Sequence, residues 1–152
     1  MRGVNARSAG VTPHRGGTGS RAVLRRVAVP AGVLAAVAGA FAYVGAVDPN
    51  RPGHYPVCPL LRYTGLYCPG CGGLRSAHAL VHGDVLAALQ DNALAVTGWL
   101  VLAVVWTVWT VRAVRGRALR IDLTPVHLWS LGALVLAFTV VRNLPFGGWL
   151  HP

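Results

Sequence analysis

The sequence predicts an all-α membrane protein with three transmembrane helices and two short interfacial helices. The first observation is composition, since 54% of the 152 residues are hydrophobic and only 12% are charged, whereas soluble domains carry about 25% charged residues. The second is a set of three long uncharged runs, at about residues 27–47, 93–111 and 124–141. Each approaches the roughly 20 apolar residues that cross a bilayer. Because lipid offers no hydrogen-bond partners to the backbone, such runs are expected to be helical.

The positive charge of the chain is unevenly distributed. All 14 basic residues are arginine, four residues are acidic, and the net charge is +10. Ten of the arginines precede the first run or lie between the second and third, which is the positive-inside pattern. We therefore expect a multi-pass protein of the cell membrane with a cytoplasmic N-terminus, and with the first loop and the C-terminus exoplasmic. The expected partners are membrane lipids, whose anionic headgroups suit basic segments, and not nucleic acid.

The first residues of the chain divide into a tail and a span. Residues 1–22 are rich in Gly, Arg, Ser and Thr, which predicts a disordered basic cytoplasmic tail. Residues 23–152 then form the membrane domain. The first run also fits a cleaved signal peptide, because arginines precede it and Ala38-Gly39-Ala40 resembles a cleavage site. Its length favours a retained span, and both interpretations place the following loop outside the cell.

The loop at residues 54–92 is expected to contain the two short helices. Residues 54–71 include three prolines and are predicted to be extended or turning. From Gly72 onward the apolar spacing becomes helical, with Gly83 ending one short helix and Asp84 capping the next. Neither helix is long enough to cross a membrane, so both are expected to lie at the interface.

This loop holds every cysteine of the chain, at Cys58, Cys68 and Cys71. Two thiols in a C-x-x-C pattern can close a small disulfide or bind a metal ion. The helix start at Gly72, together with Arg75, is expected to lower the pKa of Cys68 or Cys71 and make that thiol reactive. A c-type haem site is excluded, because glycine stands where histidine is required. An iron–sulfur cluster usually requires four thiolates.

Two histidines extend the candidate metal site. His78 and His82 are four residues apart and share a helix face, so the candidate zinc ligands are these histidines and the three cysteines. The spacing is too short for an ordinary zinc finger. Three interpretations of the cysteines stay open, namely a structural disulfide, a metal site, and redox catalysis with Cys68 and Cys71 as the thiols. No other catalytic residue is assigned.

A further candidate is an anion site at the start of the helix after the cysteines. Gly72 and Gly73 leave room for an anion such as a lipid phosphate near the backbone N–H groups. Arg75 and Arg142 would supply positive charge. Arg142 has a simpler interpretation, in which its side chain snorkels from the third span to the headgroups.

Several of these residues resemble a known family. The pattern comprises Cys58-Pro59, residues 64–73, Arg75, His78, His82-Gly83-Asp84, Ala88 and Asn92. It resembles the bacterial membrane-protein family called domain of unknown function 2752, over about residues 57–105 and again at residues 142–145. The resemblance implies a small, helical, membrane-embedded protein in which the cysteine loop matters. The family has no assigned activity, so no mechanism follows from it.

The leading functional hypothesis is a non-enzymatic subunit or adaptor whose exoplasmic cysteine loop forms a structural or ligand-binding site. Three small spans bury little by themselves, so we expect a membrane-protein partner or a homo-oligomer. Gly32, Ala36 and Gly39 offer a face of small residues for such association. The alternative is a membrane protein for thiol–disulfide exchange or zinc handling. A Walker-type nucleotide loop is excluded, because the chain contains no lysine.

Overall fold

The computed structural model describes residues 18–145 and 147 and is built from helices. The helices are α1 (Thr18–Ala46), α2 (Pro59–Thr64), α3 (Gly73–Val81), α4 (Val85–Val114) and α5 (Pro125–Arg142). Three of them are long and apolar enough to cross a membrane, namely α1 from Arg21 onward, α4 and α5. No strand occurs within the described ranges. The predicted all-α class with three spans is therefore confirmed, and the chain is a multi-pass membrane protein in contact with lipid.

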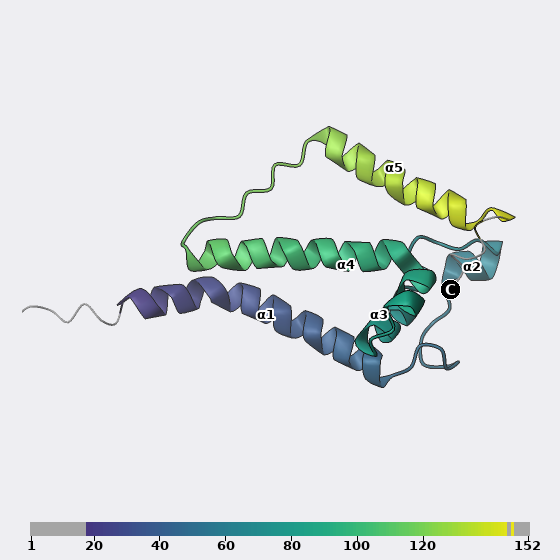
Figure 1. The fold of residues 1–152 in the computed structure, drawn as a ribbon, viewed down its shortest axis with the longest axis horizontal. Helices are drawn as coiled ribbons and strands as arrows, with labels where there is room; N and C mark the ends of the chain where they lie inside the picture. The colour runs from purple at the N-terminus through teal and green to yellow at the C-terminus, as the bar shows by residue number, and fades with distance from the viewer. Residues whose placement is uncertain (1–17, 146, 148–152) are drawn as a thin grey trace, which may run out of the picture.

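The first two spans, α1 and α4, lie side by side (Figure 1). Two tryptophans of α4 join them. The indole N–H of Trp106 donates a hydrogen bond to the carbonyl oxygen of Pro30 at 3.0 Å, and the ring of Trp99 meets the ring of Phe41 edge-on at 5.2 Å. A tryptophan contributes both a large apolar surface and one donor, which here finds a partner inside the apolar span. These contacts fix the antiparallel pair that supports the rest of the fold.

The short helix α3 packs against the end of this pair and forms the core there. Ser76 and Ala88 are fully buried, and the Ser76 hydroxyl donates to the Ala88 carbonyl at 2.7 Å. On the other side, Gly45 of α1 allows close approach, since a Cβ at that position would lie 2.8 Å from Val81 Cγ1. The buried residues thus gather mainly at one end of the molecule, which we call the cysteine end.

The junction between α3 and α4 agrees with the sequence prediction. Gly83 has φ +82 after the last turn of α3, and the Asp84 carboxylate caps α4 by accepting from the Ala87 N–H at 2.9 Å. The second short helix is present but is not separate. It forms the first turns of α4, and a kink at Asn92 (φ −163, ψ 89) joins it to the membrane span. The Asn92 side chain caps the part that follows by accepting from Ala95 N–H at 2.9 Å.

Two expectations for the connecting segments are wrong. Residues 54–71 are not extended throughout, because α2 forms a short helix within them. Pro59 suits the first position of a helix, where an N–H is not needed, and Gly65 ends it in the left-handed region with φ +72. In addition, α1 already begins at Thr18, inside the stretch predicted to be a tail. The rest of that prediction, for residues 1–17, lies outside the described residues.

The third span, α5, is arranged differently from the other two. Its N-terminal end lies away from α4. Its C-terminal end comes near the rest of the molecule, beside α2 (Figure 1). Within residues 18–145 and 147, α5 does not pack along α1, α3 or α4. Its position must therefore depend on contacts made at that end, where the cysteines lie.

Candidate functional site: the cysteine cluster

The three cysteines come together at the cysteine end. Their sulfur atoms all lie within 4.8 Å of one another. Cys68 is central, with its sulfur 3.5 Å from that of Cys58 and 2.9 Å from that of Cys71. All three are free thiols; Cys71 is buried and the other two are half-buried. We call Cys58, Cys68 and Cys71 the cysteine cluster.

The local chain conformation explains how the cluster forms. Residues 68–71 make a tight turn, the CPGC turn, in which the Cys71 N–H bonds the Cys68 carbonyl at 3.1 Å. The Cys68 N–H donates to the Cys71 sulfur at 3.2 Å. Gly72 then enters α3 with φ +80, a conformation that favours glycine. Cys58 is the residue directly before α2, and its sulfur reaches that of Cys68.

Arg142, the last residue of α5, lies behind the CPGC turn and is fully buried. One guanidinium nitrogen donates to the carbonyl oxygens of Cys68 and Cys71, both at 3.0 Å. The guanidinium also lies over the rings of Tyr67 and Phe138, at 5.6 and 5.2 Å. The expectation that Arg142 snorkels to the headgroups is therefore wrong, since its charge points into the protein and lies beside the cluster.

Two asparagines hold the remaining backbone groups of the turn. The side chain of Asn143 bonds the backbone of Tyr67 twice. Its Oδ1 accepts from the Tyr67 N–H and its Nδ2 donates to the Tyr67 carbonyl, both at 2.8 Å. Asn92, at the kink of α4, donates to the carbonyls of Pro69 and Cys71, both at 2.9 Å. Buried carbonyls need such partners. Side chains from α4 and from the end of α5 thus hold the backbone of residues 67–71.

The acidic thiol of the cluster is Cys58. The backbone N–H of Leu61 in the first turn of α2 has the largest effect, and with the thiols of Cys68 and Cys71 it lowers the pKa of Cys58 to about 7. The contact with the Leu61 N–H stabilises the thiolate of Cys58, although the Cys58 side chain does not form a full capping hydrogen bond to α2. Partial positive charge at a helix start has this effect on a thiol.

Cys71 behaves in the opposite way. Burial, followed by the hydrogen bond with the Cys68 side chain, raises the pKa of Cys71 to about 12. The prediction that the start of α3 lowers the pKa of Cys71 is wrong, because loss of water around the sulfur has the larger effect. At neutral pH in the metal-free protein, Cys58 is therefore more readily deprotonated than Cys71.

A cleft of about 520 Å³ opens in front of the cluster. Its wall is made by the segment after α1, by the residue before α2, and by the CPGC turn with the start of α3. Cys58 and Cys71 both line it, as do Gly72, Gly73 and Arg75. The residues predicted as an anion site are thus brought to one cleft with two cysteines, except for Arg142, which bonds the turn from behind.

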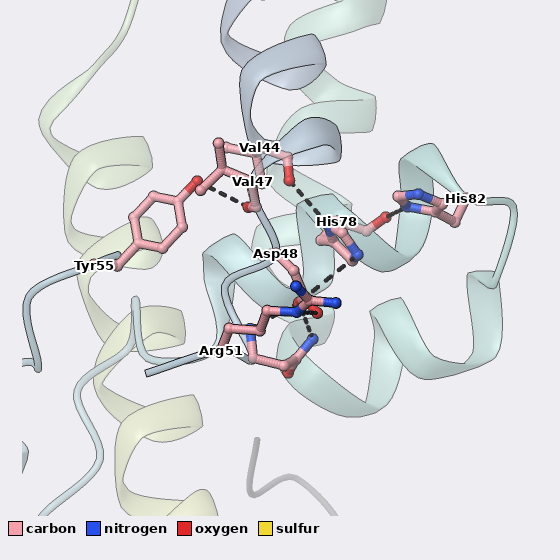
Figure 2. A network of polar contacts seen from close by, with 8 residues as sticks. Val44, Val47, Asp48, Arg51, Tyr55, His78 and His82 are labelled. Atoms are coloured by element: carbon pink, nitrogen blue, oxygen red, sulfur yellow. Dashed lines mark hydrogen bonds and ion pairs between the residues drawn. The ribbon is translucent and has the colours of Figure 1, made fainter. Parts of the chain in front are cut away.

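The two histidines lie elsewhere, in a polar network between the end of α1 and α3 (Figure 2). His78 Nδ1 lies 2.8 Å from the Val44 carbonyl oxygen, and its Nε2 lies 3.8 Å from the Asp48 carboxylate. His82 Nδ1 lies 2.8 Å from the carbonyl of His78. Of the described residues, the three cysteines alone form the group with ligand atoms inside 4.8 Å, so the histidines do not join them.

Comparison with known proteins agrees with this emphasis on the loop. Residues 58–106 match a family model described as protein of unknown function, DUF2752. The chain resembles the DUF2752 family. The matched DUF2752 region begins at Cys58 and covers α2, α3 and most of α4, so it contains the whole cysteine cluster and Asn92. No curated protein and no solved structure shows a significant match to the chain.

Sequence reasoning missed the roles of Asn92 and Asn143. Both asparagines appear in the residues that carry the DUF2752 resemblance, yet nothing in their spacing indicates what they bind. Asn143 is 76 positions from Tyr67, so no local pattern reports the contact. The useful signal is that a polar residue stands at the end of an apolar span, where it needs a buried partner.

Proposed function

We propose that the protein is a non-enzymatic membrane subunit whose cysteine cluster binds one soft metal ion, with zinc as the ion to test. The observation that carries the proposal is the convergence of three thiols from two separate segments. Zinc–sulfur bonds of about 2.3 Å in a tetrahedral site place the sulfurs about 3.8 Å apart. The sulfur separations of 2.9 and 3.5 Å, inside a group within 4.8 Å, need a shift of about 1 Å or less to reach that spacing.

The charge around the cluster supports a thiolate–metal site. Three thiolates on a divalent ion carry a net charge of −1. The guanidinium of Arg142 donates to two carbonyls of the same turn, so its positive charge is placed beside this anion. Charge compensation matters here because Arg142 is fully buried, and opposite charges interact more strongly away from water.

Metal binding would let the thiols act together as thiolates, although the pKa values of Cys58 and Cys71 differ. Cys58 supplies a thiolate at neutral pH, with its pKa of about 7. Cys71 does not, with its pKa of about 12, and only a bound cation would remove its proton. We do not include His78 and His82 among the metal ligands, because both are hydrogen-bonded to backbone carbonyls away from the cluster.

Metal content and thiol reactivity, measured on the same purified sample, test this function. Protein extracted in detergent without oxygen is expected to hold one zinc ion per chain and to resist alkylation at all three cysteines. Cys58→Ser, Cys68→Ser and Cys71→Ser should each lose the ion. His78→Gln and His82→Gln are the matched controls and should keep it, since the histidines are outside the cluster.

Two results would contradict the metal site. One is a chain without metal in which Cys58 is alkylated rapidly. The other is a disulfide between two of the cysteines in protein taken directly from its membrane. The disulfide would favour a structural staple if cysteine variants lose abundance, and thiol redox chemistry if they keep their fold but lose an activity.

A role as an adaptor for another membrane component is part of the same proposal. Gly32 and Gly39 have no atom within 4 Å of where a Cβ would stand, and they are exposed on α1 with Ala36 between them. Small residues of this kind allow close helix contact in a bilayer. Replacing both glycines by leucine should disrupt co-purification of a partner or a second copy. An unchanged complex would contradict this part.

A further inference from the structure

The cleft in front of the cysteine cluster has a distinct chemical character. Its charged lining residues are Arg51 and Arg75, and no aspartate, glutamate or histidine is among the described residues that line it. Arg51 is exposed, and its side chain lies 3.8 Å from the carboxylate of Asp48, which does not line the cleft. Arg75 is half-buried on the first turn of α3 and interacts with the carboxyl group of Asp91, which does not line the cleft. The two charged side chains on the cleft wall itself are thus both cationic, and an anionic molecule can bind there.

A metal ion on the cluster would be incomplete with protein ligands alone. Zinc binds four ligands in most sites, and sites with three protein ligands leave the fourth position to water or to a second molecule. Cys58 and Cys71 both line the cleft, so an ion held by the cluster would be reachable from it. Behind the cluster, Arg142 and Asn92 occupy the carbonyls of the turn and block that side.

The size of the cleft exceeds what a water ligand requires. Its volume of about 520 Å³ falls in the range of about 300–1,000 Å³ that holds small organic ligands. The backbone at the start of α3 is accessible from it, because a Cβ at Gly73 would meet no atom within 4 Å. The Gly73 N–H already donates to the Gly70 carbonyl at 3.0 Å, so Arg75 is the group that would hold a carboxylate here.

We propose that this cleft takes a small thiol that carries a carboxylate. Its sulfur completes the coordination of the ion held by the cysteine cluster, and its carboxylate lies against Arg75. This inference rests on the proposed metal site and names the ligand class of that site. In the binding step the thiol S–H loses its proton to water, one sulfur–metal bond forms, and a metal-bound water leaves. No electron is transferred.

Cobalt(II) in place of zinc makes the step visible, because thiolate-to-cobalt absorbance rises with each added sulfur. The full-length protein in detergent is loaded with cobalt and titrated with N-acetylcysteine. We expect a saturable rise in that absorbance. N-acetyl-S-methylcysteine should give none, since it lacks a free thiol. N-acetylcysteine amide, which lacks the carboxylate, should bind about tenfold more weakly, as expected for loss of one charge-assisted contact.

The arginine contribution is tested by Arg75→Gln, which should weaken N-acetylcysteine binding about tenfold and leave the amide unchanged. Arg62→Gln is the matched control, because Arg62 is exposed on α2 and does not line the cleft. A protein that fails to bind cobalt contradicts the proposed function. This inference is overturned, while the metal site stands, by either of two results. One is a cobalt-loaded protein whose absorbance does not change on addition of any thiol. The other is equal binding of N-acetylcysteine and its amide.

Discussion

Arg142, Asn92 and Asn143 all bind backbone groups of residues 67–71. These bonds do not require a particular state of the thiols, whereas the bond from the Cys68 N–H to the Cys71 sulfur does. Preorganisation of this kind keeps three sulfur atoms close together at little further entropic cost on binding. The residues that matter for the site include several that never touch its ligand.

Asn143→Ala tests this support directly. It removes both hydrogen bonds to Tyr67 and the one to the Thr139 carbonyl, and leaving such groups unpaired costs about 1–3 kcal/mol. We expect a lower thermal midpoint in detergent and faster alkylation of Cys71. Asn50→Ala makes the same chemical change at an exposed position and should be neutral. Equal behaviour of the two variants would contradict a supporting role for Asn143.

The unequal thiols predict a pH dependence in the metal-free protein. Since thiolates are the nucleophiles and the pKa of Cys58 is about 7, its alkylation rate should rise through pH 7 and level off above it. Cys71, with a pKa of about 12, should stay slow across this range. Site-resolved mass spectrometry after brief iodoacetamide treatment measures both. Faster reaction at Cys71 than at Cys58 at neutral pH would refute the assignment.

The sequence predicted that the three cysteines lie close together, because they share a short loop between two spans, and the structure brings their sulfur atoms within 4.8 Å of one another. It did not reveal which thiol is acidic, since that depends on α2. The helix α2 was missed because the prolines of residues 54–71 indicate a break, whereas Pro59 stands at the first position of the helix, which tolerates proline. Arg142 was misread because its acceptors lie 71 and 74 positions away.

At the scale of elements, the contact between α1 and α3 connects the membrane pair to the cluster. It depends on Gly45, where any side chain would meet Val81. The spans themselves were predictable from composition alone, because apolar length suffices to place a helix in lipid. The close contact was not, since a glycine inside an apolar run indicates neither its partner nor the distance.

Gly45→Ala should therefore destabilise the fold, by about 1–3 kcal/mol as is typical of overpacking. Gly98→Ala, on α4 and with open space around it, should be neutral or stabilising by up to about 1 kcal/mol, because alanine is the better helix former. The double variant Gly45→Ala with Val81→Ala should recover most of the loss. Thermal unfolding in one detergent compares all four proteins, and no rescue in the double variant would contradict the contact.

At the scale of the whole molecule, opposite ends carry different chemistry. The chain reverses at each span, so the start of α1 and the end of α4 lie together, away from the cysteine end (Figure 1). Arg26 of α1 lies beside Gly116 after α4, and Arg117 lines the same small pocket as Arg26. The predicted orientation places this basic end in the cytoplasm.

That orientation has a direct test. In intact cells, a membrane-impermeant maleimide applied after metal removal should label Cys58 from outside. A cysteine introduced as Arg117→Cys should be labelled only after the membrane is permeabilised. The double variant Cys58→Ser with Arg117→Cys serves as the control for background. Labelling of position 117 from outside would reverse the topology, and with it the assignment of the cleft to the exoplasmic side.

The attachment of α5 by its final residues has a consequence for biogenesis. Arg142 follows Cys71 by 71 positions, so at about 5–20 residues per second the ribosome needs about 4–14 seconds to supply the side chain that completes the turn. During that interval the thiols have been synthesised but lack this support. The cysteine loop is thus made before the residue that completes it, and a chain truncated before residue 142 carries every sulfur and no finished site.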